Sequence, residues 1–168
     1  MPLLLPASSI KELVMTIRKV GVVGCGLMGS GIAQVCAQAG LQTVVREAND
    51  DFLRKGLGKI DGFLQKGVEK GKMKPEQKAE IMGRIKGTTK AADLADCDLV
   101  IEAIIENMVE KRKLFAELDQ ACKPSAIFAS NTSSLCIVEM AAATKRQDKV
   151  CGLHFFNPVP LMPLVEVV

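Results

Sequence analysis

The stretch of sequence that decides the fold is Gly24-Cys25-Gly26-Leu27-Met28-Gly29. An apolar run rich in β-branched residues, 19–23 (KVGVV), precedes it, and a run of small and apolar residues, 30–39 (SGIAQVCAQA), follows it. The first run is typical of a buried strand and the second of a helix that Gly40 ends at the C-cap position. A glycine-rich turn between a strand and a helix indicates a phosphate site, because the N–H groups of the first helical turn attract anions.

The three glycines of this turn have separate predicted tasks. Gly24 permits the tight turn, Gly26 lets the backbone approach a pyrophosphate, and Gly29 lets the helix pack close to the sheet. Leu27 and Met28 complete the loop, so we expect them to border the cofactor as well. The pattern therefore predicts a dinucleotide site. The alternative is a glycine turn that holds no ligand.

Glu47 supports the dinucleotide prediction. It follows the second predicted strand, 43–45, about 18 residues beyond Gly29, where dinucleotide-binding folds place the acid that binds the adenosine ribose. Arg46 next to it is a residue type that accepts the 2′-phosphate of NADP. A carboxylate at Glu47 would repel that phosphate, so the pair favours NAD.

Strands and helices alternate along the rest of the chain. Further strands are predicted at 98–105, 126–129, 150–156 and 164–168, and further helices at 51–70, 75–84, 109–122 and 135–143. Continuous apolar strands alternating with helices are typical of an α/β protein whose parallel sheet is buried on both faces. We therefore expect a Rossmann-type fold with a mainly parallel sheet and flanking helices.

Composition limits the function classes. The 168 residues carry a net charge of +3 and contain neither Trp nor Tyr, so a stacking surface for nucleic acid is not expected. No apolar run approaches the roughly 20 residues that span a membrane. We interpret residues 1–14 as an N-terminal extension, with Met15 as a natural start, and residues 15–168 as one NAD-binding domain.

The six cysteines are scattered and form no Cys-x-x-Cys pair. Most lie in apolar segments, which is typical of free thiols in a reducing compartment, so a cytoplasmic location is expected. With a single histidine in the chain, no metal site is expected.

That histidine, His154, ends a late strand in the segment 152–158 (GLHFFNP). A lone histidine in an apolar strand is by default a core residue, but strand ends also carry ligands in open α/β sheets. Glu166 is the one acid in the terminal strand and needs a partner if buried. If the proline-rich connection 158–163 turns the chain back, the two side chains can pair, and the acid would fix the tautomer of the ring.

A serine-rich segment, 130–134 (SNTSS), follows the strand at 126–129. One interpretation is a helix cap, in which Ser133 or Ser134 accepts the first backbone N–H groups of the next helix. The other is a contact with the ligand. The two roles are compatible.

Three motifs together resemble a known family. They are GCGLMGSGIA (24–33), FASNTSSL (128–135) and GLHFFNPVP (152–160). They look like the NAD-binding domain of L-3-hydroxyacyl-CoA dehydrogenases, and most like the 3-hydroxybutyryl-CoA type. The resemblance covers nearly all residues from about Thr16 to Val168. The last two motifs are specific, whereas the glycine loop is shared with many dehydrogenases.

The resemblance implies three catalytic residues. His154 would be the general base that removes the proton of the 3-hydroxyl group, Glu166 would orient it, and Ser133 would contact the substrate oxygen near the nicotinamide. The implied reaction is reversible oxidation of an (S)-3-hydroxyacyl-CoA to the 3-ketoacyl-CoA in fatty acid metabolism, including β-oxidation.

The resemblance also implies binding residues. Glu106, Lys111, Ser133 and Asn157 match positions that line the cofactor site. Lys111 also lies near the acyl-CoA, and Lys70 matches a position that can meet the CoA phosphates.

The chain departs from the family pattern at several points. Phe63 stands where some relatives have a serine near CoA, Pro163 where a basic residue is common, and Glu47 where an aspartate is usual. Relatives continue into an all-helical domain that supplies dimer contacts, part of the acyl pocket and a catalytic asparagine. We therefore expect that domain to be missing here, the isolated fragment to be inactive, and self-association into a homo-oligomer through the uncovered surface.

Two other function classes are compatible with parts of the sequence. A stand-alone NAD-binding or regulatory module needs the glycine loop and Glu47 but no pairing of His154 with Glu166. A 2-hydroxyacid or sugar-acid dehydrogenase shares the glycine loop, but usually has a lysine base on a later helix and does not fit the motif at 152–160. An NAD-dependent dehydrogenase of 3-hydroxyacyl-CoA thioesters fits all of these features best.

Overall fold

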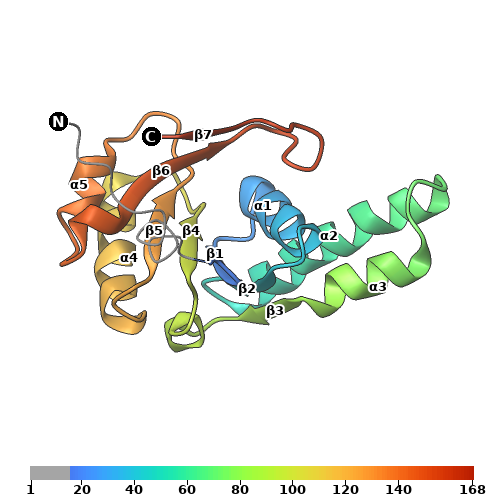
Figure 1. The fold of residues 1–168 in the computed structure, drawn as a ribbon, viewed down its shortest axis with the longest axis horizontal. Helices are drawn as coiled ribbons and strands as arrows, with labels where there is room; N and C mark the ends of the chain where they lie inside the picture. The colour runs from blue at the N-terminus through green and yellow to red at the C-terminus, as the bar shows by residue number, and fades with distance from the viewer. Residues whose placement is uncertain (1–15) are drawn as a thin grey trace, which may run out of the picture.

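A seven-stranded sheet runs through residues 16–168, the part of the chain that the computed structural model describes (Figure 1). Its strands are β1 (Lys19–Val23), β2 (Gln42–Arg46), β3 (Ile85–Thr88), β4 (Leu99–Glu102), β5 (Ile127–Ser130), β6 (Val150–Phe155) and β7 (Val165–Val167). They lie in the order β3-β2-β1-β4-β5-β6-β7, with β1 to β6 parallel and β7 antiparallel to β6. This sheet confirms the predicted Rossmann-type fold.

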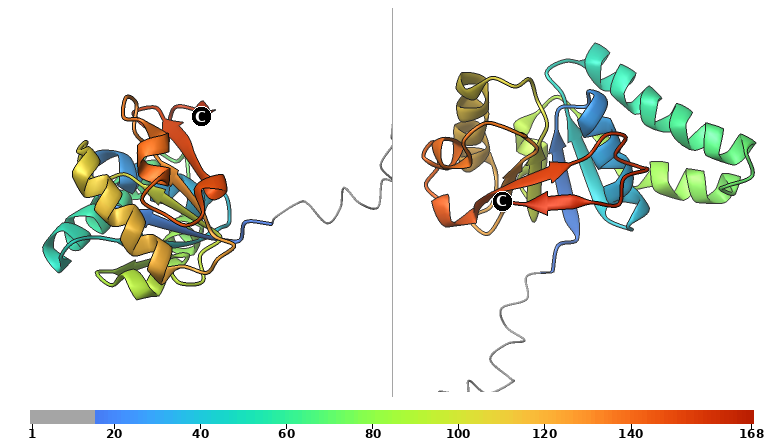
Figure 2. Two further views of the ribbon diagram at one scale, coloured as in Figure 1. Left: turned by 90° about the vertical axis from the view of Figure 1, so that its left-hand side faces the viewer. Right: turned by 90° about the horizontal axis from the view of Figure 1, so that it is seen from above.

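Helices cover both faces of the sheet (Figures 1 and 2). They are α1 (Leu27–Gln38), α2 (Asp50–Glu69), α3 (Pro75–Gly83), α4 (Met108–Ala121) and α5 (Ile137–Ala141), with the 3-10 turns η2 (Ala91–Leu94) and η3 (Gln147–Lys149). One core cluster packs α1, α2 and α3 against the sheet, and a second packs α4 and α5 against the opposite face. The helices α2 and α3 form a long hairpin that projects beyond the sheet (Figure 1).

The strand order places a binding crevice at the middle of the sheet. From β1 the chain crosses by α1 to β2 on one side, whereas β4 lies on the other side of β1. In open α/β sheets, ligands bind outside the carboxyl ends of the strands at such a switch point, because the two crossovers diverge there and leave a gap. The glycine loop follows β1 directly, so it lies at this point.

The structure corrects several predicted element boundaries. The strand β3 is absent from the prediction, because Ile85–Thr88 reads IKGT and carries one large apolar side chain. The helix α1 begins at Leu27, inside the segment predicted as a turn. The strand predicted at 98–105 ends at Glu102, and the helix predicted at 135–143 covers only Ile137–Ala141. The proposed extension, 1–14, lies outside the described residues.

No helix within residues 16–168 is both long and apolar enough to cross a membrane. The same residues contain no cluster of three or more His, Cys, Asp or Glu side chains that could hold a metal ion. All six cysteines are free, and four of them are buried, as the sequence predicts.

Candidate functional site

The glycine loop has the geometry of a phosphate cradle. Gly24 has φ of +93°, and a Cβ atom there would lie 2.5 Å from the carbonyl oxygen of Ala103. A Cβ at Gly29 would lie 1.8 Å from the carbonyl oxygen of Gly24, so the nearest obstacle is the turn itself rather than the sheet. Around Gly26 the space is open, and no side chain caps the start of α1. The helix N-terminus can therefore receive an anion, and these residues fit a pyrophosphate.

Glu47 reaches back to this loop. One carboxylate oxygen, Oε1, accepts a hydrogen bond of 2.5 Å from the backbone N–H of Cys25, and Oε2 accepts one of 3.0 Å from Ala48. Each carboxylate oxygen has a second lone pair, so the same group can still accept ribose hydroxyls. Burial, with the charge of Glu47 as a second cause, raises the pKa of the Cys25 thiol to about 12.

His154 and Glu166 form a hydrogen-bonded pair. They lie directly opposite each other in the antiparallel register of β6 and β7, and Nδ1 of His154 is 2.8 Å from Oε2 of Glu166. The imidazole is partly buried and the carboxylate more exposed. The connection between the two strands turns the chain back, as expected, so the predicted contact is confirmed. Its part in catalysis stays a prediction.

The loop after β5 is organised by Thr132 and Asn131. The hydroxyl of Thr132 accepts the N–H groups of Ser134 and Leu135, at 3.3 and 2.9 Å, and donates to Glu106. Oδ1 of Asn131 accepts the N–H of Phe155 at 2.9 Å, which ties the loop to the strand that carries the histidine. No role is predicted for either residue from the sequence.

The predicted helix cap at Ser133 or Ser134 is wrong. The helix α5 begins only at Ile137, and its N-cap residue, Cys136, makes no side-chain cap. In this loop the hydroxyl of Thr132, rather than that of either serine, accepts backbone N–H groups, those of Ser134 and Leu135. Ser133 is exposed and borders a cavity instead.

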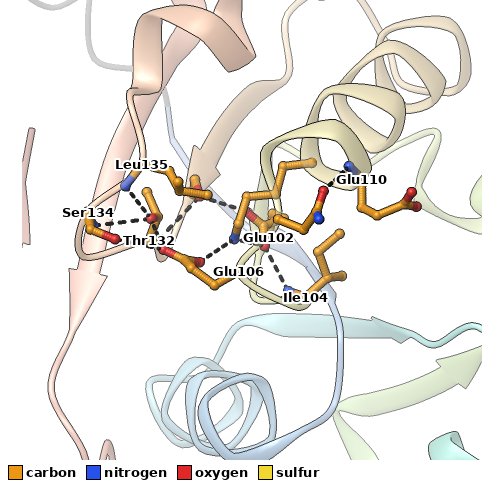
Figure 3. Close-up of polar contacts among 10 residues, drawn as sticks. Glu102, Ile104, Glu106, Glu110, Thr132, Ser134 and Leu135 are labelled. Carbon is orange, nitrogen blue, oxygen red and sulfur yellow. Dashed lines mark hydrogen bonds and ion pairs between the residues drawn. The ribbon is translucent and has the colours of Figure 1, made fainter.

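A buried charge network lies beneath this loop (Figure 3). Lys111 on α4 and Glu102 at the end of β4 are almost fully buried, with Nζ and Oε1 2.6 Å apart, and Nζ also lies 3.1 Å from Oε2 of Glu106. Glu102 accepts further hydrogen bonds from the hydroxyl of Ser130, at 2.5 Å, and from the N–H of Ile104, at 2.7 Å. The network joins the ends of β4 and β5 to α4.

The charge of Glu106 is stabilised within this network. Burial alone would raise the pKa of its carboxyl, but the hydrogen bonds from Thr132 and Lys111 outweigh burial and lower the pKa. Glu106 is therefore an anion at neutral pH at the edge of the cavity. Since Lys111 is buried against two carboxylates, its ammonium group is already neutralised in the structure.

Two adjoining cavities bring the predicted residues together. A cavity of about 600 Å³ is bordered by Gly24, Gly26, Leu27, Met28 and Glu47. A second, of about 400 Å³, is bordered by Met28, Glu106, Lys111, Ser133, His154 and Asn157. Both are also bordered by Ala103 and Ile104 at the end of β4, so they form one groove along the carboxyl edge of the sheet. Such a groove suits an extended dinucleotide that points one end at the histidine.

Lys70 lies apart from this groove. It is the exposed C-cap residue of α2, at the tip of the α2–α3 hairpin, and borders neither cavity. Phe63 is partly exposed on the same helix and borders a different cavity, beside Asn157 and Pro160. The expected contact of Lys70 with CoA stays a prediction.

The fold and the groove define the class: a Rossmann domain that binds a nicotinamide dinucleotide beside a histidine–carboxylate pair. The family profile described as "3-hydroxyacyl-CoA dehydrogenase, NAD binding domain" matches residues 19–168. The chain therefore belongs to the 3-hydroxyacyl-CoA dehydrogenase family, as the sequence resemblance predicts, and its cofactor is NAD.

Individual relatives agree with this assignment. The probable 3-hydroxybutyryl-CoA dehydrogenase of Deinococcus radiodurans is 51% identical over 150 residues, which are 89% of this chain and 54% of the relative. Among solved structures, M. tuberculosis FadB2 has a TM-score of 0.89 at 46% identity, with 91% of this chain and 54% of that chain covered. The (S)-3-hydroxybutyryl-CoA dehydrogenase PaaH1 of Ralstonia eutropha has a TM-score of 0.88 at 45% identity, with 90% and 54% covered. The chain thus spans about half the length of these relatives.

Proposed function

We propose that this chain is the cofactor-binding part of an NAD-dependent enzyme that interconverts (S)-3-hydroxyacyl-CoA and 3-ketoacyl-CoA. The observation that carries the proposal is the contact between His154 and Glu166, at the border of a cavity that continues into the glycine-loop groove. A module that only binds NAD needs the groove but has no use for a paired histidine. Two of the relatives are named 3-hydroxybutyryl-CoA dehydrogenases, which supports a 3-hydroxyacyl-CoA with a short acyl chain as the substrate.

The geometry supports a general-base role for His154. Its Nδ1 atom is engaged by Glu166, so Nε2 is the nitrogen left to accept the proton of a 3-hydroxyl group. The carboxylate holds the ring in the required tautomer and stabilises the imidazolium that forms. When bound, NAD supplies the acceptor for the hydride that leaves carbon 3. In the reverse direction His154 returns the proton to the oxygen of the keto group.

Other residues of the groove would position the reactants. Ser133 is exposed at the cavity border, where its hydroxyl can donate to the substrate oxygen. Asn157 and Glu106 border the same cavity and would contact the nicotinamide half of the cofactor. Lys111 would hold the carboxylate of Glu106 in place beside the nicotinamide half of the cofactor. Lys70 would contact the CoA phosphates only if the CoA extends along α2.

We also propose a second domain and a cellular location for the protein. A second, helical domain would enclose the acyl group and supply contacts between subunits, since the groove is open in this chain. A cytoplasmic location is part of the same proposal, and the free cysteines support it.

Replacement of His154 tests the proposed role. In the full-length protein, His154→Ala should lower kcat for 3-hydroxybutyryl-CoA oxidation by roughly 10²- to 10⁴-fold, the usual contribution of a positioned general base. Glu166→Gln should also lower kcat, because it keeps the shape of the side chain and removes the charge. The dissociation constant for NADH, measured by fluorescence titration, should change little in either variant. Near-normal turnover of His154→Ala would show that the histidine is only structural.

A further inference from the structure

A third cavity continues the groove beyond the glycine loop. It measures about 270 Å³ and lies at the carboxyl end of β2, bordered there by Arg46 and Glu47 and on the side of α4 by Glu110, Lys113 and Glu117. It shares Gly24, Glu47, Ala48, Ile104 and Glu110 with the glycine-loop cavity. Because Glu47 is at the position that binds the adenosine ribose in this fold, the third cavity is the adenosine end of the groove.

Both cations that border this cavity are already held by carboxylates. The two terminal nitrogens of Arg46, Nη1 and Nη2, bind the two oxygens of Glu117 on α4, at 3.0 and 2.9 Å. Nζ of Lys113 lies 2.9 Å from Oε1 of Glu110. A two-point contact between guanidinium and carboxylate is more directional than a single charge pair, so Arg46 is fixed more firmly than Lys113.

The guanidinium of Arg46 is also largely buried. Its side chain is 18% exposed, and its Nε atom is buried without a hydrogen-bond partner among residues 16–168. A buried N–H group without a partner is costly, and a phosphate oxygen could satisfy it only if the side chain left its present position. Arg46 therefore has a free donor, but its two terminal nitrogens are turned to α4 and engaged there.

These contacts matter for the choice between NAD and NADP. Enzymes of this fold that use NADP commonly bind the 2′-phosphate with an arginine near the end of the second strand. This chain has such an arginine, Arg46, immediately before Glu47. Its two terminal nitrogens, however, are bound to Glu117. Repulsion by Glu47 and neutralisation of Arg46 would then act against the same phosphate.

We propose that Glu117 is a specificity-determining residue, which keeps Arg46 from accepting the 2′-phosphate of NADP. The inference rests on the proposed function, because it needs the adenosine ribose to lie at Glu47. It adds a determinant on α4, far in sequence from the glycine loop and from the acid after β2.

The experiment measures dissociation constants for NADH and NADPH by fluorescence titration of the 168-residue chain. The variants are Glu47→Gln, Glu117→Gln, the double variant, and the double variant with Arg46→Met. Glu80→Gln is the matched control, because it also removes a carboxylate that pairs with an arginine, on α3 and outside the groove. Circular dichroism shows whether each variant is folded, and Glu117→Asp, which keeps the charge but shortens the side chain, is a second test of the two-point contact.

Against the Glu47→Gln background, Glu117→Gln should tighten NADPH binding about tenfold, the gain of one charge-assisted phosphate contact. The affinity for NADH should stay within about threefold. Arg46→Met should abolish the gain, Glu117→Asp should give a smaller gain in the same direction, and Glu80→Gln should give none.

Two results would overturn the inference: no gain in NADPH affinity in the folded double variant, or a gain that persists after Arg46→Met. If the unaltered chain binds neither nucleotide, the cofactor site of the proposed function fails as well. The affinity of the unaltered chain for NADH thus separates failure of the inference from failure of the proposed function.

Discussion

Glu102 holds three segments together at the end of the groove that His154 borders. Its side chain is fully buried and binds Lys111, the hydroxyl of Ser130 and the N–H of Ile104. Burying two opposite charges gives little net stability, but removing one of them leaves the other without compensation. The network therefore matters less as a source of stability than as a constraint that fixes three segments together.

Replacing Glu102 by glutamine should consequently be severe. We expect Glu102→Gln to lower the free energy of unfolding by about 3 kcal/mol, because the buried Lys111 ammonium then keeps only the half-exposed carboxylate of Glu106 as its counter-charge. Urea denaturation monitored by circular dichroism measures this change. The double variant Glu102→Gln with Lys111→Met should recover part of the loss, since it removes the buried ammonium that has lost its buried partner.

An exposed pair provides the comparison. Lys113→Gln breaks the contact with Glu110, in which both side chains are well exposed, and should change the free energy of unfolding by less than about 1 kcal/mol. Equal losses for Lys113→Gln and Glu102→Gln would contradict the distinction between the buried and the exposed pair.

The sequence identified single site residues where one physical criterion was enough. Glu166 stood out because it is the one acid in an apolar terminal strand, and its pairing with His154 followed from a turn between the strands. Glu102 is likewise flanked by apolar residues, within the run 98–105, but no role was predicted for it. The roles of Thr132 and Asn131 in the loop after β5 depend on contacts between segments distant in sequence, and no local pattern indicates those contacts.

Among the elements, the prediction succeeded where burial is strong on both faces. Apart from one charged residue at an end, Lys19 in β1 and Glu102 in β4, these two strands are apolar, and α2 has apolar side chains every three or four residues. The edge strand β3 lacks such a run and could not be recognised, because its order comes from pairing with β2. The starts of α1 and α5 differ from the prediction: α1 begins inside the glycine turn, and the loop before α5 is held by hydrogen bonds to the side chain of Thr132.

Asp98 joins elements at the other end of the strands, where the amino ends of β1 and β4 lie. Its Oδ2 atom accepts the N–H groups of Arg18 and Lys19 at 2.8 and 2.9 Å, and Oδ1 accepts Nζ of Lys123 at 2.5 Å. The Lys123 hydrogen bond, followed by the two backbone N–H groups, lowers the pKa of Asp98 to about 2. The carboxylate therefore ties the start of β1 to the start of β4 and to the segment before β5.

The pH dependence of stability should show this link. A carboxyl whose pKa is lowered on folding contributes stability above its unfolded pKa of about 3.9, and that contribution is lost as the pH falls towards 2. With a discount for solvent screening, we expect Asp98→Asn to cost roughly 1–2 kcal/mol above pH 5 and progressively less below pH 4. Urea denaturation of both proteins between pH 3 and 7 measures the difference. A difference independent of pH would contradict the assigned pKa.

At the scale of the whole molecule, binding of NADH requires fewer structural features than catalysis does. The cofactor groove is formed entirely by residues 16–168, so the chain should bind NADH. Catalysis also needs the acyl group held about 3–3.5 Å from the nicotinamide and shielded from water, and the open groove provides neither. We expect the purified 168-residue chain to bind NADH but to reduce acetoacetyl-CoA at a small fraction of the rate of an intact family member, as followed by NADH absorbance. Comparable rates would contradict this expectation.

The surface around β7 leads to a related expectation. Large apolar side chains are exposed there, namely Leu161, Met162, Leu164, Val165, Val167 and Val168. An exposed apolar edge strand favours pairing with another chain, so self-association at high concentration is expected. Sedimentation velocity of the chain and of Val167→Lys measures it, because a lysine on an edge strand opposes pairing. Identical behaviour of the two proteins would place the contact elsewhere.

The pairing of β6 with β7 decides whether His154 and Glu166 can meet at all. His154 and Glu166 face each other only in the observed register, and successive side chains of a strand point to opposite faces. A slip of one residue would not weaken the contact gradually; it would turn the carboxylate to the other side of the sheet. An insertion or deletion in the connection that shifted the pairing by one residue would therefore separate the two side chains completely rather than partly.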